Sequence, residues 1–227
     1  MKTFKELQES ITKALVKFGT KGIRKVQPNI KFTEFGKTTS RFNPDIDGKI
    51  IRDKYALDDE PLALFVGRLV PHKGIGILIR SLTYTQRGKL LIVGDGPYKN
   101  WLVNLVKKLD LNDRVIFVGP VDDYWLPSYY SATDVVVLPS TSRLEAFGIV
   151  GLEGMATAKP LILSDIPGVR DVISEKEGYI VEPLDPSAIA EALEKIWNAP
   201  EMAREMGLRG RETVSYTHLT LPTKASV

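Results

Sequence analysis

The sequence predicts an α/β fold, namely a doubly wound parallel sheet of the Rossmann-like type. From Pro61 onward, short apolar runs alternate with segments of helical periodicity, which is typical of a parallel sheet covered by helices. The runs are rich in Val, Ile and Leu, as expected of strands whose two faces are both buried. Six strand–helix units of this kind follow one another before residue 200.

Each element of this sheet is predicted from its periodicity. The helix expected over residues 98–109 places Trp101, Leu105 and Leu109 on one face, and the last helix repeats this spacing from Ile189 to Trp197. Ligands of such sheets bind at the carboxyl ends of the strands, so we expect the site in the loops that follow them. The expected strands are 62–66, 90–93, 115–118, 134–138, 160–163 and 179–181, and the expected helices 74–84, 98–109, 123–131, 148–158, 168–174 and 186–197.

The residues before the sheet have a different character. Residues 5–18 read as a short amphipathic helix that ends at Gly19, and residues 20–47 show no period and read as a linker. Residues 1–41 hold ten basic and three acidic side chains. This basic arm is either a solvated helix face, the interpretation we favour, or a segment that attracts acidic lipid head groups.

Composition excludes several classes of protein. The net charge is +3 from 31 basic and 28 acidic residues, which is too balanced to indicate nucleic acid as a partner. The absence of cysteine excludes disulfides, Cys-ligated metals and a thiol nucleophile, and fits a reducing compartment. No apolar run approaches the roughly 18 residues that span a bilayer, and no secretory signal is present. We therefore expect a cytoplasmic protein, at most peripheral at the inner face of a membrane.

Common nucleotide and metal motifs do not fit. The run that begins at Gly94 follows an expected strand, but Lys99 stands where a dinucleotide fingerprint needs its third glycine. Gly36-Lys37-Thr38 resembles the end of a P-loop but lacks the first glycine and a preceding strand. Asp45 and Asp47 lie in a Pro/Gly-bounded turn, and the two histidines are far apart, so no metal site is expected.

Two loops instead indicate a site that binds an anion. Arg68 and Lys73 follow the first expected strand, where a planar guanidinium and an ammonium can grip a diphosphate, although solvated loop cations are an equal alternative. Glu145 precedes a helix that begins near Gly148, whose free N–H groups favour a phosphate. Glu153 follows about two turns later. Because carboxylates do not bind phosphate, these two point to hydroxyl groups such as those of a sugar; a helix cap and a solvent-facing residue are the simpler alternatives.

These residues together resemble the donor-binding, C-terminal half of the GT-B glycosyltransferases of family 4. The resemblance covers about residues 44–213, and the sequence differs from the usual family pattern at Ala146 and Lys159. The motifs, in order, are Gly67-Arg68-x4-Lys73-Gly74, Gly94-x-Gly96-Pro97, Phe117-Val118-Gly119, Leu138-Pro139-Ser140 and Glu145-x7-Glu153.

The resemblance implies a nucleotide-activated sugar donor (a UDP-, GDP- or ADP-sugar), retention of anomeric configuration, no metal, and an unidentified sugar or lipid-linked acceptor. It implies that Arg68 and Lys73 hold the diphosphate, that Glu145 contacts the hexose, that Glu153 binds ribose hydroxyls and that loop 119–123 meets the nucleobase. The expected catalytic residues are Arg68, Lys73 and Glu145, and the expected donor-binding residues are Gly67, Gly94, Gly119, Val121, Phe147, Gly148, Ile149 and Glu153.

The resemblance also divides the chain. Residues 1–60 are expected to be the last helix of an N-terminal acceptor domain plus a linker, 61–213 the donor-binding domain, and 214–227 a non-native tail that packs against nothing. A fragment of this kind would bind donor without transferring the sugar. Two alternatives stay open: a non-catalytic sugar-nucleotide binding module, and half of a sugar-nucleotide epimerase.

Overall fold

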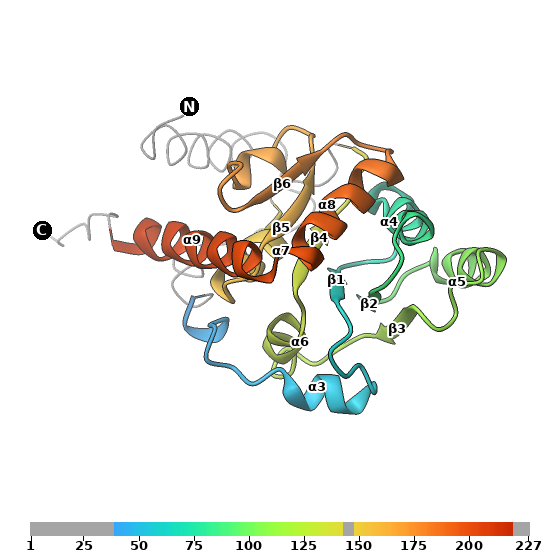
Figure 1. Ribbon diagram of the computed structural model, residues 1–227, viewed down its shortest axis with the longest axis horizontal. Coiled ribbons are helices and arrows are strands. Elements are labelled where there is room, and N and C mark those ends of the chain that lie inside the picture. Colours follow the sequence, from blue (N-terminus) through green and yellow to red (C-terminus); the bar gives the residue numbers. More distant parts are fainter. Residues whose placement is uncertain (1–38, 143–147, 220–227) are drawn as a thin grey trace, which may run out of the picture.

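The computed structural model describes residues 39–142 and 148–219, with side chains to residue 215, and is built on one parallel sheet (Figure 1). Its six strands lie in the order β3-β2-β1-β4-β5-β6, and every neighbouring pair is parallel. The doubly wound α/β fold is thereby confirmed. The strands are β1 Leu62–Val66, β2 Lys89–Val93, β3 Val115–Gly119, β4 Val135–Leu138, β5 Leu161–Ser164 and β6 Gly178–Val181.

All six strands lie within one residue of their predicted bounds. Alternate residues of β1 to β5 enter two separate cores, so that Ala63 and Phe65 face one core and Leu62 and Leu64 the other. Because both faces are covered, the runs are apolar at every position rather than at every second one.

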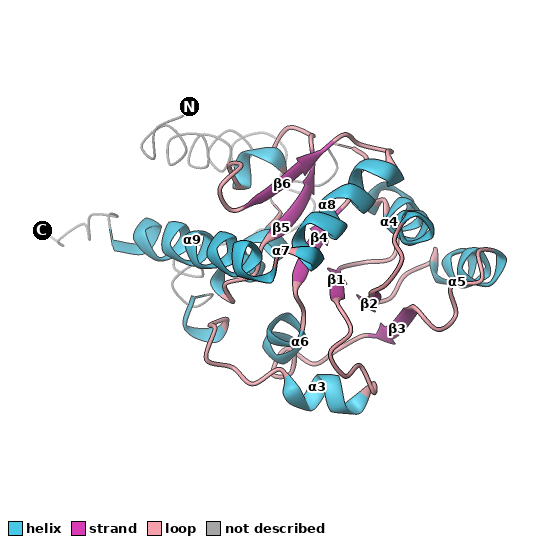
Figure 2. Ribbon diagram, in the orientation of Figure 1, coloured by secondary structure: helices cyan, strands magenta, loops and turns pink. Residues whose placement is uncertain are grey.

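Helices cover both faces of the sheet (Figure 2). One core is closed by α4 (Ile75–Ser81), α5 (Lys99–Lys108) and α8 (Pro186–Asn198), and the other by α3 (Lys49–Lys54), α6 (Leu126–Ala132) and α7 (Ile149–Ala156). The last helix, α9 (Pro200–Leu219), packs against both α7 and α8. The α8 N-terminus is capped by Asp185, whose side chain accepts hydrogen bonds from the Ser187 and Ala188 amides.

The predicted helix over residues 168–174 is wrong. This segment contains only the three-residue 3-10 helix η4 (Arg170–Val172) and becomes extended at Ile173. The turn at Pro167-Gly168, with Gly168 at φ +95°, leaves few residues for a helix. The Glu177 carboxylate then accepts a hydrogen bond from the Ser174 amide and draws the chain into a turn before β6.

The folded domain also begins earlier than predicted. Residues 42–60 were assigned to a linker, but Phe42, Ile51 and Leu57 are each at most 3% exposed and lie in the core beside β1. The helix α3 was not predicted because its six residues are too few for a period to be recognised.

The expectation that residues 214–227 pack against nothing is wrong for the first of them, Val214. Helix α9 continues to Leu219, and Val214 is 6% exposed within the core that contains Phe42 and Met155. The weak helix propensity of the Thr-rich segment predicted that the helix would end, but tertiary packing supplies most helix stability in proteins.

Replacing Val214 by Ala is expected to lower the free energy of unfolding by about 1.5 kcal/mol, the transfer value of two buried methyl groups. For a domain of this size the melting temperature should fall by about 3–6 °C. Glu212→Ala, on the exposed side of the same helix turn, is the control. Equal melting temperatures for the two variants would show that the end of α9 contributes nothing to the fold.

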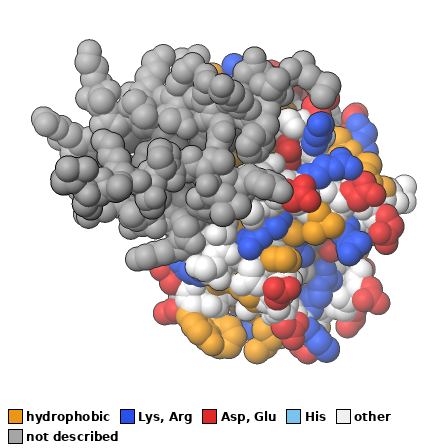
Figure 3. All heavy atoms as spheres, turned by 90° about the vertical axis from the view of Figure 1, so that its left-hand side faces the viewer, with side chains coloured by type: hydrophobic (Ala, Val, Ile, Leu, Met, Phe, Trp, Pro, Cys, Tyr) orange, Lys and Arg blue, Asp and Glu red, His pale blue; other side chains and the backbone are white. Residues whose placement is uncertain are grey.

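The described surface is mixed in charge. In the face shown in Figure 3, basic and acidic side chains are interspersed with hydrophobic ones. Among the described residues, no helix is both long and apolar enough to span a membrane.

Candidate functional site

The candidate site lies where the strand order reverses, between β1 and β4. The connection after β1 turns to one side of the sheet and that after β4 to the other, which in folds of this type opens a crevice for a ligand. The first connection contains the 3-10 helix η2 (Pro71–Lys73). The Thr141 amide, after β4, donates a 2.8 Å hydrogen bond to the His72 carbonyl of η2. The two loops are therefore joined.

Glycines allow these loops to approach closely. Gly74 has φ +69°, and a Cβ there would lie 1.8 Å from the Pro139 carbonyl oxygen. In the same way, a Cβ on Gly94 would lie 2.0 Å from the Gly67 carbonyl oxygen. The loop after β2 is thus held against the loop after β1. Gly67 and Gly94, which were predicted to bind the donor, lie where these two loops meet.

The two predicted cations lie on this fixed loop. Arg68 is exposed, and within residues 39–142 and 148–219 its guanidinium makes no hydrogen bond or ion pair. Lys73 is half-buried, and its Nζ lies 4.0 Å from where a Gly67 Cβ would stand. Both charges are therefore placed at the carboxyl end of β1, as the sequence predicted.

The predicted anion-favouring helix end is α7. Its N-cap, Gly148, is buried with φ +51°, and the first residue, Ile149, is 40% exposed. The amides at the start of a helix have no acceptor within the helix, and the helix dipole adds partial positive charge there. This end of α7 follows β4 and so belongs to the same edge of the sheet as Arg68 and Lys73.

Glu153 lies on α7 and is partly buried. Its Oε2 accepts a 2.6 Å hydrogen bond from the Tyr130 hydroxyl of α6. Burial raises the pKa of Glu153, while the Tyr130 hydrogen bond and the charge of Arg41 lower it and the charge of Asp123 raises it. Because of this hydrogen bond and its partial burial, Glu153 is not a free solvent-facing residue. The prediction that it binds ligand hydroxyls then concerns mainly its other carboxylate oxygen.

The raised pKa makes Glu153 a cost to stability at neutral pH. In the folded state the ionised form is disfavoured, so the stability present below the ordinary glutamate pKa is lost as pH rises through the folded-state value. Glu153→Gln should therefore raise the free energy of unfolding at pH 7.5, and the gain should disappear as the pH falls below the ordinary glutamate pKa. Urea unfolding of parent and variant at pH 7.5 and at a pH below that pKa measures the gain. A variant that is less stable than the parent at pH 7.5 would contradict this reading.

The predicted nucleobase loop follows β3. Gly119 has φ +83° with nothing within 4 Å of where a Cβ would stand, and Val121 is half-buried. The Arg41 guanidinium donates a hydrogen bond to the Asp123 carbonyl and lies 3.3 Å from its carboxylate. A residue from before the sheet thus holds the far end of this loop.

Two predicted residues, Glu145 and Phe147, lie outside the described residues. Tyr130 and Arg41 were missed by sequence reasoning. A tyrosine in an apolar helix carries no signal of a carboxylate partner 23 positions later, and Arg41 was counted only as part of a basic arm.

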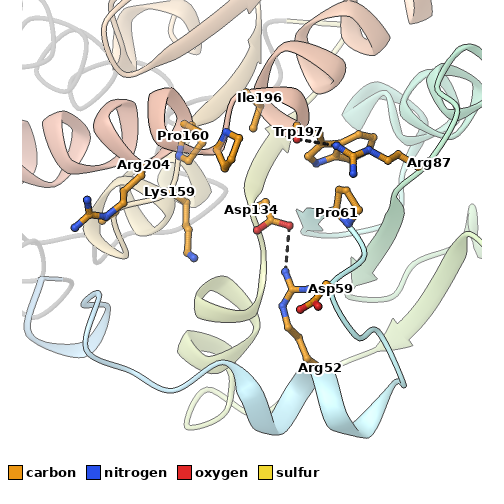
Figure 4. A pocket seen from close by; sticks show the side chains of 13 residues that line it. Arg52, Asp59, Pro61, Arg87, Asp134, Lys159, Pro160, Ile196, Trp197 and Arg204 are labelled. Carbon is orange, nitrogen blue, oxygen red and sulfur yellow. Dashed lines mark hydrogen bonds and ion pairs between the residues drawn. The ribbon is translucent and has the colours of Figure 1, made fainter.

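Lys159, where the sequence differs from the usual family pattern, lies far from these loops in the fold. It precedes β5, so it stands at the amino ends of the strands, in a pocket of about 410 Å³ (Figure 4). Its Nζ donates a 3.0 Å hydrogen bond to the Ser131 carbonyl, and burial lowers its pKa. Asp134, in the same pocket, is paired with Arg52 at 3.1 Å. The difference at Lys159 therefore lies outside the candidate site.

A second pocket, of about 490 Å³, lies between α3, α6 and the loop after β3. Val118, Pro120 and Val121 line one side, and Ile50 and Tyr55 the other. It adjoins the predicted nucleobase loop.

Comparison with known proteins gives a consistent result. The family model described as "Glycosyl transferases group 1" matches residues 47–213. An alpha-D-kanosaminyltransferase from Streptomyces kanamyceticus is 37% identical over 161 residues, which is 69% of this chain and 41% of that protein. The chain thus spans less than half the length of this curated relative.

Solved structures agree. The C-terminal domain of a glycosyl transferase group 1 family protein from Francisella tularensis has a TM-score of 0.68 at 26% identity, covering 80% of this chain and 97% of that one. The Anabaena protein HepE, solved in complex with UDP, has a TM-score of 0.74 at 22% identity, covering 79% of this chain and 50% of that one, and shows likeness of fold alone.

Proposed function

The chain belongs to the glycosyl transferases group 1 family, as a GT-B C-terminal domain, and from this membership we propose that it is the donor-binding part of a retaining glycosyltransferase. The parent enzyme transfers a hexose from a nucleoside diphosphate sugar to a sugar or lipid-linked acceptor without a metal. The observation that carries the proposal is the joining of the Arg68–Lys73 loop to the loop after β4, beside the α7 N-terminus.

This arrangement suits departure of a nucleoside diphosphate. Negative charge grows on the diphosphate as its bond to the sugar breaks, and Arg68, Lys73 and the first amides of α7 stabilise that charge. Preorganised donors of this kind each contribute roughly 3–4 kcal/mol to the transition state. Glu153 binds the ribose hydroxyls, and the loop at Gly119 and Val121 receives the nucleobase. Glu145 and Phe147 are assigned to the hexose by family resemblance.

Lys73→Ala tests the proposal by calorimetry with UDP and GDP. A hydrogen bond to a charged group is worth about 1.5–3 kcal/mol, so affinity for the preferred nucleotide should fall roughly 10- to 150-fold. Lys107→Ala, at the distal end of α5, is the control and should bind as the parent does. Unchanged binding by Lys73→Ala would overturn the assignment.

We also propose that the 227-residue chain binds donor without transferring its sugar. In a two-domain transferase the acceptor hydroxyl must be held in attacking geometry, and that positioning supplies much of the rate. Robust turnover of a donor sugar with a panel of sugar acceptors would contradict this. Formation of an epimer from donor alone would favour the epimerase alternative.

A further inference from the structure

The Tyr130 hydroxyl is buried against the carboxylate of the proposed ribose-binding residue. Tyr130 is 0% exposed, and its ring meets Phe42 edge to face at 5.3 Å. The hydroxyl has a single proton, which it donates to Glu153 Oε2 at 2.6 Å. A bond this short is typical of an O–H donor with an ionised acceptor. The ring is thus fixed by packing, and the hydroxyl by the carboxylate.

The other carboxylate oxygen has a different status. Among residues 39–142 and 148–219, no donor is hydrogen-bonded to Glu153 Oε1, and the side chain is only partly buried. A glutamate on a helix normally samples many rotamers, and ordering it on binding costs free energy. Because Tyr130 holds Oε2, the side chain is already ordered in the folded protein, and little further ordering is needed on binding. Oε1 therefore keeps one orientation.

The two charges near the pair act on Glu153 in opposite directions. Arg41 favours the ionised form of Glu153, and Asp123, which is bonded to Arg41, opposes it. Within the described part of the chain, these two groups and Tyr130 are the charged or titratable residues that shift the pKa of the carboxylate. An ionised carboxylate accepts hydrogen bonds from hydroxyls, whereas a protonated one loses acceptor capacity.

We propose that Tyr130 is a positioning residue that holds Glu153 by Oε2 and presents Oε1 to the ribose hydroxyls of the donor nucleotide. The inference rests on the proposed function, because it requires Glu153 to bind ribose. It assigns to α6 a part in nucleotide recognition, although Tyr130 touches no ligand itself.

The test compares ribose and dideoxyribose. Affinities are measured for the nucleotide that the parent chain binds best among UDP, GDP and ADP, and for its 2′,3′-dideoxy form. The variants are Glu153→Gln, Tyr130→Phe and the matched control Tyr129→Phe. Tyr129 is the neighbouring buried residue of α6. Its hydroxyl is paired with the Tyr55 hydroxyl at 3.2 Å, whereas that of Tyr130 is paired with a carboxylate.

Glu153→Gln should remove most of the preference for the ribose form. Tyr130→Phe should weaken the ribose form about 3- to 10-fold, the value of one ordinary hydrogen bond, and leave the dideoxy form unchanged. It should also move the acid loss of ribonucleotide binding to higher pH, since the Tyr130 bond lowers the pKa of Glu153. Tyr129→Phe should match the parent in all three measurements.

The outcomes separate the two proposals. If no nucleotide binds the parent, or if Glu153→Gln keeps the ribose preference, the ribose role in the proposed function is overturned, and the positioning role with it. If Glu153→Gln removes the preference but Tyr130→Phe keeps the parent's affinities, only the positioning role is overturned. Equal weakening of both nucleotides by Tyr130→Phe would indicate a purely structural role and also overturn it.

Discussion

Gly74→Ala is expected to destabilise the domain by about 2–5 kcal/mol and to weaken nucleotide binding. Its backbone lies in the left-handed region, which costs roughly 1–2 kcal/mol for a residue with a Cβ. The new methyl group would also meet the Pro139 carbonyl, a backbone atom that moves only with the loop after β4. Overpacking of this kind typically adds 1–3 kcal/mol. Urea unfolding and calorimetry with UDP or GDP measure the two effects.

Gly119→Ala separates the two causes. Gly119 also has a left-handed backbone, with φ +83°, but a Cβ there would have nothing within 4 Å. It should therefore lose only the conformational part, about 1–2 kcal/mol. If Gly74→Ala costs no more than Gly119→Ala, the close approach of the loops after β1 and β4 does not contribute to stability.

The sheet was predictable from sequence because each strand is a local signal. A run such as Leu62–Val66 is apolar at every position, and a strand buried on both faces requires that composition. The place of the site followed from the order of elements, since loops after parallel strands share one edge. The positions of Arg68 and Lys73 at this edge were predictable for the same reason, because they depend only on following β1.

Other features depend on contacts between distant residues. Val214 looked unfit for a helix, and only the core around Phe42 shows why α9 continues through it. Tyr130 is an aromatic residue in an apolar helix until Glu153 is placed beside it. Arg41 is one of ten basic residues in its segment, and its bond to Asp123 spans 82 positions. No spacing in the sequence encodes these pairs.

The opposite edge of the sheet contains a turn that one arginine side chain holds by hydrogen bonds. At the amino ends of the strands, Arg114 donates hydrogen bonds to the Gly88, Leu82, Thr85 and Arg87 carbonyls, at 2.5–3.0 Å, and to the Thr85 hydroxyl at 2.7 Å. Burial lowers the pKa of this guanidinium. One side chain thus satisfies four carbonyls and one hydroxyl in and beside the turn between η3 (Leu82–Tyr84) and β2.

Arg114→Met is expected to lower the free energy of unfolding by about 3 kcal/mol. A hydrogen bond to a charged group is worth about 1.5–3 kcal/mol, and water replaces some of the five at this half-buried position. The melting temperature should fall by about 6–12 °C. Arg114→Lys should recover little, because an ammonium lacks the planar fork that reaches several carbonyls at once.

Arg87→Met is the matched control, since the exposed Arg87 side chain bonds, among the residues that the structure describes, only the Trp197 carbonyl and the Asn198 side chain. A surface change of this kind should cost less than about 1 kcal/mol. Below its melting temperature, Arg114→Met should bind UDP or GDP as the parent does, because the candidate site lies at the carboxyl ends of the strands. A loss of affinity in the folded variant would show that the amino-end turn is coupled to nucleotide binding, and a loss of stability no larger than that of Arg87→Met would remove its structural role.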